Sequence, residues 1–446
     1  MSALNHLLRV FGAHSGKDAV VWRDRVYSYA WLLDALRRWD ALLDDRAVAP
    51  GSVVSVEADF SPEAIGLLLA LIRRSCIVVP LAAAVEARKG EFTEIAQVET
   101  VIGVGEDGSC RFRSTGARAD HELLLRLRQS ARPGLILFSS GSTGRSKAVV
   151  HDLVPLLEKF AVPRHALRTI AFLLFDHIGG INTLLYNLSN AGCIVTVEKR
   201  LPDTVCAAIE KHRVQLLPTS PTFINLLLVS EAYRRHDLSS LELVTYGTEV
   251  MPESTLVRFH ELFPKVRLLQ TYGLSEVGIL RSTSRSSDSL WVKIGGEGFE
   301  TRVVDGMLEI KARSAMLGYL NAPSPFGDDG WFRTGDAVEV DGEYLRILGR
   351  KSELINVGGE KVYPAEVESV LQAMDGVENV AVRGESNPIT GQIVSARVKL
   401  RTNETVAEFR SRMFVYCRER MPRFKIPQKV FLVSEDVHGE RFKKMR

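Results

Sequence analysis

Cysteine is scarce in this sequence, and its few cysteines form no recognisable framework. The 446 residues include five, an odd number, and no CxxC pair occurs among them. Such scattered cysteines argue against a disulfide-stabilised scaffold or a structural zinc site, and they suit a reducing cytoplasm. The five are Cys76, Cys110, Cys193, Cys206 and Cys417.

Long apolar runs and an excess of one charge are also missing. The longest clean apolar stretch, 64–72, is about half of what a bilayer span requires. The N-terminal segment lacks the apolar core and cleavage site of a signal peptide. Lys plus Arg number 57 and Asp plus Glu 54, a balance too even to indicate nucleic acid or an anionic membrane as the main partner. We therefore expect a cytoplasmic protein with no membrane span and no nucleic-acid partner.

What the sequence does contain is the composition of an ordinary globular protein. Hydrophobic residues make up 46% and charged residues 25%, which excludes global disorder. Short apolar runs alternate with helical patterns, as in the strand 52–57, the helix 62–73 and the strand 77–81. Buried strands separated by helices of about ten residues predict an α/β fold with a doubly wound sheet.

The pattern also predicts domain boundaries. From about residue 289 to 349 the chain turns to shorter, Gly-rich alternating stretches, which indicates a small β subdomain at the end of a large N-terminal domain, 1–350. The remaining residues, 351–446, combine helical and strand patterns and suffice for a small α+β domain. No Pro/Ser-rich spacer separates the two, so we expect a hinge near residue 350.

One segment carries the first chemical signal. In LILFSSGSTGRSKAVVHD, residues 135–152, an apolar strand runs into hydroxyls, glycines and then Lys147. Glycines let backbone N–H groups approach phosphate oxygens, hydroxyls add donors and a lysine adds charge. The spacing is not that of a Walker loop, and a surface turn is the alternative. The candidate phosphate ligands are Ser139, Ser140, Gly141, Ser142, Thr143, Gly144 and Lys147.

Three further motifs follow: QTYGLSEVG at 270–278, DGWFRTGD at 329–336 and GRKSELINVGGEKVYPAEVE at 349–368. Each has a purely structural interpretation when taken alone. Tyr272 and Gly273 could end a strand, Asp336 could be a capping residue, and Gly358–Gly359 could form a hairpin turn. Their joint order makes coincidence a poor explanation.

With all four motifs, the chain resembles the adenylate-forming superfamily of acyl- and aryl-CoA synthetases, nonribosomal adenylation domains and luciferases. SSGSTGRSK resembles the family's phosphate loop, YGLSE its YGxTE motif, WFRTGD its TGD motif, and GRKSE with the Gly-Gly loop its hinge. The resemblance covers nearly the whole chain. Within the family, the FDHIGG and GRKSE segments are most similar to short ligases of the o-succinylbenzoate–CoA type.

The resemblance implies a reaction in two steps. A carboxylate attacks the α-phosphorus of ATP, which gives an acyl-adenylate and pyrophosphate, and a thiol then displaces AMP to give a thioester. The thiol belongs to CoA or to the phosphopantetheine of a carrier protein. The C-terminal domain is expected to rotate about Ser352 between the steps and to present Gly358 and Gly359 to the thiol channel.

The resemblance also assigns roles near the nucleotide. Glu276 is a carboxylate suited to Mg²⁺, Ser275 a donor to the α-phosphate, and Tyr272 with Gly273 a wall for adenine. Asp336 suits the two ribose hydroxyls, with Arg350 assisting. Gly247, Thr248 and Glu249 match the adenine-pocket segment, although Glu249 alone could equally be a solvated turn carboxylate.

The family's mobile-domain lysine is less easily placed. Gly439 is followed by Glu440 where the family has lysine. Spacing from the KIP-like segment 425–427 assigns the role to Lys443, with Lys444 in reserve and a basic solvated tail as the alternative. A mobile ammonium there would meet the charge of the adenylation transition state.

Residues 174–181, LFDHIGGI, resemble the acyl-pocket segment of the family. His177 is then a pocket wall, and Gly180 leaves room beside it. Asp176 lies where amino-acid-activating relatives hold the substrate amine, but it could instead cap the helix that follows. The sequence does not specify the acid.

We therefore expect an ATP-dependent acid–thiol ligase. Two alternatives stay open: a freestanding adenylation enzyme that loads an amino or hydroxy acid onto a carrier protein, and a non-catalytic adenylate-binding protein whose terminal lysine motif has drifted.

Overall fold

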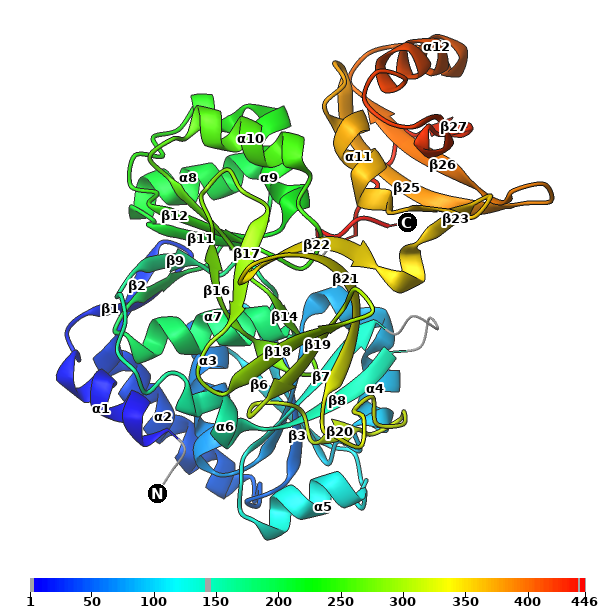
Figure 1. Ribbon diagram of the computed structural model, residues 1–446. Coiled ribbons are helices and arrows are strands. Elements are labelled where there is room, and N and C mark those ends of the chain that lie inside the picture. The colour runs from blue at the N-terminus through cyan, green and yellow to red at the C-terminus, as the bar shows by residue number, and fades with distance from the viewer. Residues whose placement is uncertain (1–3, 141–145, 440–441, 446) are drawn as a thin grey trace. The chain divides into compact units, whose positions relative to one another are not determined.

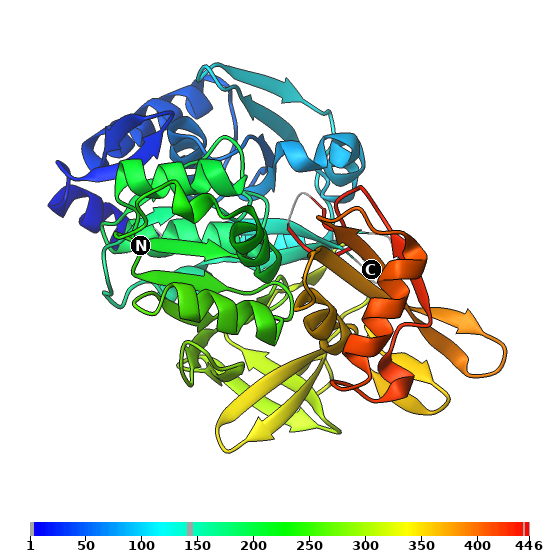
Figure 2. The same cartoon turned by 90° about the horizontal axis from the view of Figure 1, so that it is seen from above.

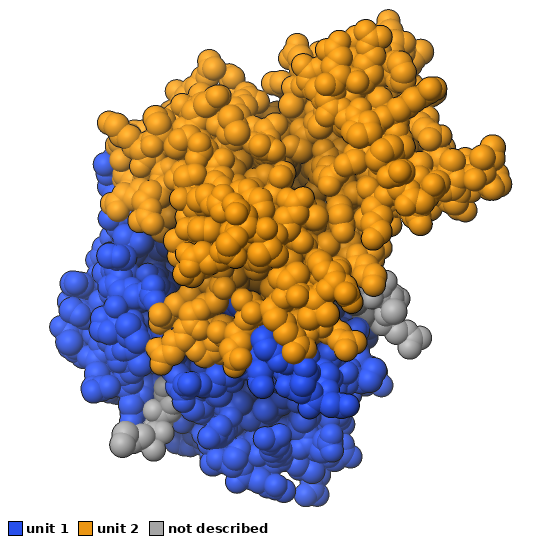
Figure 3. All heavy atoms as spheres, viewed as in Figure 1, with its two compact units in different colours: residues 1–218, 273–280, 311–332 blue, residues 219–272, 281–310, 333–446 orange. Residues whose placement is uncertain are grey.

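The computed structural model describes residues 4–140, 146–439 and 442–445. It divides into two compact units (Figure 3). Unit 1 comprises Met1–Pro218, Gly273–Leu280 and Lys311–Phe332, and unit 2 comprises Thr219–Tyr272, Arg281–Ile310 and Arg333–Arg446. Among the described residues, no helix is both long and apolar enough to cross a membrane.

Unit 1 contains a seven-stranded mixed sheet in the order β20-β8-β7-β4-β3-β5-β6 (Figure 1). Its central strands pair in parallel, β3 with β4 and β5, and β4 with β7. These strands are Val- and Ile-rich and buried, as expected where helices cover both faces of a sheet. The bounds are β3 Val53–Glu57, β4 Ile77–Leu81, β5 Thr100–Val104, β6 Cys110–Ser114, β7 Gly134–Ser140, β8 Ser146–Asp152 and β20 Gly318–Tyr319.

A second run of strands in unit 1 has the order β11-β9-β10-β1-β2. The pairs β11–β9, β9–β10 and β10–β1 are parallel, and β1–β2 is an antiparallel hairpin. The bounds are β1 Asp18–Trp22, β2 Arg25–Ser28, β9 Arg168–Ile170, β10 Cys193–Val195 and β11 Leu216–Thr219. Strand β9 is only three residues long, because the chain leaves the sheet after Ile170.

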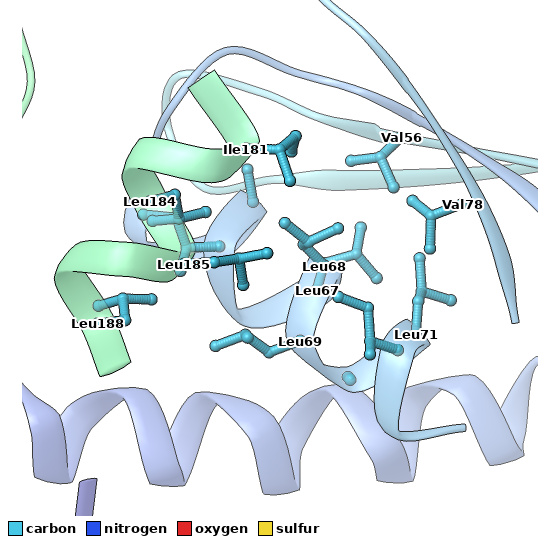
Figure 4. Packing of buried hydrophobic residues seen from close by; sticks show 14 of the residues in the cluster. Val56, Leu67, Leu68, Leu69, Leu71, Val78, Ile181, Leu184, Leu185 and Leu188 are labelled. Atoms are coloured by element: carbon cyan, nitrogen blue, oxygen red, sulfur yellow. The ribbon is translucent and has the colours of Figure 1, made fainter. Parts of the chain in front are cut away.

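The core of unit 1 forms around helix α3, Pro62–Arg73. Ser61 caps its first turn and Pro62 occupies the first helical position, where a missing N–H costs nothing. Nearly every residue from Ala64 to Ile72 is buried, because other elements cover this helix on all sides. Figure 4 shows its leucines meeting Val56, Val78 and the apolar face of α7, Ile178–Ser189.

The remaining helices of unit 1 complete its layers. They are α1 Asn5–Ala13, α2 Tyr29–Asp45, η1 Ala83–Arg88, α4 Lys89–Ile95, α5 Glu122–Gln129, α6 Leu153–Glu158 and α8 Pro202–His212. A short hairpin, β14 Gly273–Leu274 with β15 Gly278–Ile279, also belongs to this unit and carries the last four residues of the YGLSE motif.

Unit 2 begins with helices and a parallel strand pair. Strands β12 Leu243–Tyr246 and β13 Arg267–Gln270 pair in parallel and are joined by helix α10 Glu253–Leu262. Helix α9 Pro221–Ser230 and the short turn η2 Ala232–Arg234 precede them.

A six-stranded antiparallel sheet follows in the order β16-β17-β22-β21-β19-β18. It corresponds to the predicted β subdomain and adds one strand before it. The bounds are β16 Arg281–Ser284, β17 Trp291–Gly295, β18 Phe299–Val304, β19 Met307–Ala312, β21 Phe332–Asp341 and β22 Tyr344–Arg350.

The C-terminal region of unit 2 has its own α+β core. Strand β26 pairs with β23, β25 and β27, and helix α12 lies against this sheet (Figure 2). Phe409, Met413 and Cys417 of α12 are buried in the same cluster. Thr405 and Glu408 form a capping box at the start of α12. The bounds are η3 Lys351–Glu353, β23 Ile355–Val357, β24 Glu360–Val362, α11 Pro364–Gln372, β25 Val377–Asn387, β26 Gly391–Leu400, α12 Val406–Cys417, η4 Arg423–Lys425 and β27 Lys429–Leu432.

This core supports the predicted α+β character of 351–446, whereas the boundary at residue 350 stays a prediction. The cysteines are free thiols, four of them buried and Cys110 exposed.

Candidate active site

In unit 1, two predicted site residues meet around a tyrosine. Tyr319 donates its hydroxyl hydrogen to Glu276 Oε1 at 2.7 Å, and the ammonium of Lys147 lies 5.1 Å from the centre of the same ring. The antiparallel pairing of β20 with β8, with Tyr319 opposite Val149, places this ring beside Lys147. One tyrosine thus contacts two groups of opposite charge: the ammonium of Lys147 through its ring face and the carboxylate of Glu276 through its hydroxyl.

The strands around Lys147 are fixed by backbone pairing. Ser139 lies opposite Lys147, and Ser140 opposite Ser146, in the β7–β8 ladder. The amide of Asn321 accepts from the Ala148 N–H and donates to the Ser146 carbonyl, both at 2.9 Å. The predicted phosphate ligands Gly141, Ser142, Thr143 and Gly144 lie outside the described residues.

Three hydrogen bonds hold the turn that carries Ser275 and Glu276. His151 Nε2 lies 2.5 Å from the Ser275 carbonyl oxygen. Burial lowers the pKa of His151 to about 4, so near neutral pH its ring is uncharged and its Nε2–H donates. The Met316 N–H donates to the Glu276 carbonyl at 2.7 Å, and the Ser314 hydroxyl donates to the Val277 carbonyl at 3.0 Å.

In unit 2, three other predicted residues come together. Tyr272 donates its hydroxyl hydrogen to Asp336 Oδ2 at 2.5 Å, and Arg350 Nε lies 3.4 Å from Asp336 Oδ1. Asp336 and Arg350 are cross-strand partners in β21 and β22. Burial raises the pKa of Asp336, while the Arg350 charge and the Tyr272 hydrogen bond act against that rise. Burial and the Asp336 charge raise the pKa of Tyr272, so its phenol stays protonated.

The segment after β12 is the next predicted contact. A side chain at Gly247 would meet the Thr271 carbonyl oxygen at 2.7 Å, which explains the glycine. Thr248 has a φ of 73°, a conformation that non-glycine residues adopt rarely. The carboxylate of Glu249 accepts from the Thr222 N–H at 2.8 Å and from the Lys444 N–H at 3.2 Å.

The predicted acyl-pocket segment precedes α7. His177 is the N-cap of that helix, and its Nδ1 accepts from the Gly179 N–H at 3.1 Å. The alternative that Asp176 caps the helix is therefore wrong, because the helix begins at Ile178 and the residue directly before it does the capping. A side chain at Gly180 would lie 2.0 Å from the Leu174 carbonyl oxygen, so close packing alone requires this glycine.

Asp176 itself is buried, with 5% of its surface exposed. It acts electrostatically on Arg200, whose pKa is lowered by burial while the charges of Asp59 and Asp176 oppose that effect. The Arg200 Nε–H donates to the Phe172 carbonyl at 2.6 Å. A buried carboxylate near a half-buried guanidinium is the arrangement expected for a compensated charge.

The predicted hinge and thiol-channel residues lie in the C-terminal half of unit 2. Ser352 belongs to the short turn η3. Gly358 and Gly359 form the β23–β24 turn with φ values of 61° and 95°, and the Gly359 N–H donates to Asn356 Oδ1 at 2.9 Å. A side chain on either glycine would meet nothing within 4 Å, so backbone conformation, rather than lack of space, favours glycine here.

The two candidate lysines at the C-terminus differ in their surroundings. Lys443 is exposed. Lys444 places its ammonium 3.2 Å from Glu368 Oε2, and the side chains of this pair are only 5% and 1% exposed.

Three residues of this site escaped the sequence interpretation: Tyr319, His151 and Asn321. Tyr319 pairs with Val149 across β20 and β8, and Asn321 bonds to Ser146, 175 residues away. His151 joins the site through Ser275, 124 residues along the chain. No spacing rule marks a tyrosine or an asparagine for such a role. The HD pair at 151–152 beside the phosphate loop is the one local signal that could have drawn attention to His151.

Comparison with known proteins agrees with these motifs. The chain matches the model of the AMP-binding enzyme family over residues 94–312, and that of the AMP-binding enzyme C-terminal domain over 366–443. It is 27% identical to an indoleacetate–CoA ligase of Aromatoleum aromaticum, over 95% of this chain and 92% of that one. It is 31% identical to a (methyl-dioxo-octahydro-inden-yl)propanoyl:CoA ligase of Mycobacterium tuberculosis, over 74% and 69%.

A solved structure shares the fold over the whole chain. The anthranilate CoA ligase AuaEII, in complex with anthranoyl-AMP, superposes with a TM-score of 0.83 at 20% identity, covering 100% of this chain and 95% of that one.

Proposed function

The chain belongs to the family of AMP-binding enzymes, and from this premise we propose how its residues serve an AMP-forming acid–thiol ligase. The enzyme activates a carboxylic acid with ATP and transfers the acyl group to a thiol. In the first step a carboxylate oxygen bonds to the α-phosphorus and pyrophosphate leaves. In the second step the thiol sulfur bonds to the acyl carbon, AMP leaves, and the thiol proton passes to solvent. The acceptor that we propose is CoA.

The observation that carries the residue assignment is the contact of Tyr319 with both Lys147 and Glu276. A fixed ammonium and a fixed carboxylate at the end of the predicted phosphate loop suit a triphosphate and its metal ion. Lys147 would neutralise phosphate charge, and Ser275 would donate to the α-phosphate.

Glu276 fits a magnesium ion in its chemistry. Mg²⁺ is usually held by one or two carboxylates together with substrate phosphates, so a cluster of protein ligands is not needed. The hydrogen bond from Tyr319 to Oε1 orients the Glu276 carboxylate, as partners of metal ligands commonly do. When bound, the ion would neutralise charge as pyrophosphate departs.

The Tyr272–Asp336–Arg350 group is proposed for the nucleoside. A carboxylate has lone pairs enough to accept from both ribose hydroxyls while it also accepts from Tyr272 and Arg350. The Tyr272 ring supplies the flat apolar face that adenine stacking needs. Asp176, His177 and Gly180 remain the proposed wall of the acyl pocket.

Acid-dependent ATP–pyrophosphate exchange tests this proposal. The panel should include indoleacetate, anthranilate and fatty acids of several lengths, since named relatives act on acids of these kinds. Thioester formation should then be measured with the best acid and either CoA or a phosphopantetheinylated carrier protein. Exchange with at least one acid and thioester formation with CoA are expected. Thioester formation with the carrier alone would reject CoA, and a lack of exchange with every acid would reject the assignments.

A further inference from the structure

The C-terminal tail, defined here as residues 437–439 and 442–445, is folded back on itself. The Gly439 N–H donates to the Lys443 carbonyl at 3.0 Å, and the Met445 N–H donates to the Val437 carbonyl at 2.8 Å. His438 and Lys444 form an antiparallel bridge between these two hydrogen bonds. The described part of the tail is therefore an ordered return and not a solvated basic extension.

The tail is attached to the beginning of helix α9 and to the segment after β12. The Ser220 hydroxyl, at the N-cap of α9, donates to the Phe442 carbonyl at 2.8 Å. The carboxylate of Glu249 accepts from Thr222 through Oε1 and from Lys444 through Oε2, in both cases from the backbone N–H. Glu249 thus links the first turn of α9 to the tail, and each of its carboxylate oxygens accepts one of the two hydrogen bonds.

Phe442 adopts a backbone conformation that is uncommon for a residue other than glycine. Its φ is 49°, which is strained for a bulky side chain. The ring packs edge-on against Phe223 with centres 5.5 Å apart and stacks on His438 at 5.3 Å. Because this turn directly precedes the two lysines, the contacts of Phe442 set the direction in which each lysine leaves the backbone.

Lys443 and Lys444 differ in their exposure and in their contacts. The Lys444 ammonium is buried against Glu368, whose other oxygen accepts from the Val382 N–H at 2.9 Å. Removing one member of such a pair leaves a buried charge without compensation. The Lys444 side chain is therefore held by Glu368. Lys443 directly precedes Lys444, which pairs with His438 in an isolated bridge, and it is exposed.

We propose that Glu249 and Lys444 are positioning residues that fix the tail so that Lys443, and not Lys444, is the lysine available for adenylation. Glu249 docks the tail through a backbone N–H, and the Lys444–Glu368 pair anchors it to helix α11. This inference rests on the proposed function, which gives a tail lysine its part in adenylation. It also replaces the interpretation of Glu249 as a nucleotide contact.

The test compares Glu249→Gln, Lys444→Met and Lys443→Met in two assays: ATP–pyrophosphate exchange, and conversion of the synthetic acyl-adenylate of the best acid to thioester. Lys443→Met should lower exchange by about 10²- to 10³-fold. Glu249→Gln and Lys444→Met should each lower the kcat of exchange by about tenfold, the scale of one hydrogen bond to a charged group, with the KM for ATP within about twofold of the parent. None should slow thioester formation from the adenylate. Glu261→Gln, on the exposed face of α10, is the matched control.

A double variant separates docking from nucleotide contact. If Glu249 acts only by presenting Lys443, then adding Glu249→Gln to Lys443→Met costs nothing further, because the shared effect is already lost. A further tenfold loss together with a raised KM for ATP would overturn the proposal in favour of a direct contact. A larger loss in Lys444→Met than in Lys443→Met would reverse the assignment of the two lysines.

Amide hydrogen exchange gives a readout that does not depend on activity. Glu249→Gln should increase exchange at Lys444 and the adjoining tail residues, and Glu261→Gln should not. If the tail amides of Glu249→Gln stay as protected as those of the parent, Glu249 does not hold the tail. That result would leave the proposed ligase function intact. Normal adenylation by Lys443→Met overturns the presentation of that lysine, whereas a parent enzyme that adenylates no acid at all counts against the proposed function itself.

Discussion

Lys147 and Lys443 are the two lysines that the motifs assign to the phosphates of ATP, and the fold supports them differently. Lys147 lies within β8, where its backbone pairs with Ser139 and the neighbouring valines are buried. Lys443 lies in a tail that hydrogen bonds, ring contacts and one ion pair attach to α9, Glu249 and α11. A strand in a buried sheet cannot move without unfolding, whereas a tail fixed by a few side-chain contacts can be released while the core stays folded.

This difference suggests a division of labour. Lys147, which we propose for phosphate binding, is part of the core, and Lys443, which we propose for one step alone, is attached by contacts that can break. Substitutions around Lys147 should therefore affect binding and both steps, while those around the tail should affect adenylation alone. The predictions below test this comparison, from the largest expected effect to the smallest.

Glu276→Ala should lower Mg²⁺-dependent pyrophosphate exchange by about 10³-fold, because it removes the proposed metal ligand from a preorganised site. The thermal midpoint should not fall, since Glu276 is only partly buried at the surface of a hairpin. Steady-state exchange and calorimetry measure the two effects. Glu158→Ala, an exposed carboxylate of α6, is the control, and near-normal exchange in Glu276→Ala would remove Glu276 from the metal site.

His151 should make the protein less stable as the pH falls. The unfolded chain takes up a proton near the ordinary pKa of 6.5, whereas the folded protein does so only near 4. Between these values the unfolded state binds more protons, so the stability present above pH 6.5 is lost as the pH drops toward 4, by up to about 3 kcal/mol.

Urea unfolding at pH 7.0 and 4.5 measures this effect, with His151→Gln as the comparison. Glutamine retains an N–H donor but does not titrate, so its stability should change less between the two pH values. Parallel curves for the parent and the variant would show that His151 does not titrate between them.

Tyr319→Phe should raise the KM for Mg·ATP by about tenfold. The variant keeps the ring beside Lys147 but loses the hydroxyl that orients Glu276, and losing such a partner typically costs 10- to 100-fold in metal affinity. Tyr344→Phe, in β22, serves as the matched control. An unchanged KM would mean that the Glu276 carboxylate is oriented without Tyr319.

Ser352→Pro should produce the smallest effect, a slowing of thioester formation by a few-fold with adenylation within about twofold. Proline fixes φ and should hinder the rotation that we predict at η3, while a short turn accepts proline without loss of fold. Single-turnover measurement of the two steps provides the test. Equal rates in parent and variant for both steps would place the hinge elsewhere.

The sequence alone predicted the α/β class, the β subdomain and the α+β C-terminal region, because these depend on hydrophobic period and glycine placement. Its four motifs, taken together, also indicated a single family. Within unit 1, Lys147 and Glu276 contact the same tyrosine, and within unit 2, Asp336 and Arg350 lie close together.

Several details had no local signal. Asp176 and His177 are adjacent and both can cap a helix, so the choice depended on where α7 begins, which is decided by packing around Gly179 and Gly180. Tyr319 became part of the site only because β20 pairs with β8.

The sequence by itself thus determined which chemical groups are available and the order in which they come, since side-chain chemistry and motif spacing are local properties. The tertiary structure decided which group touches which. Glu249 is engaged by the tail, Lys444 is buried against Glu368 and Lys443 is exposed. The physical reason is that a carboxylate or an ammonium takes its role from the partner and the dielectric around it, and residues distant in the chain supply both.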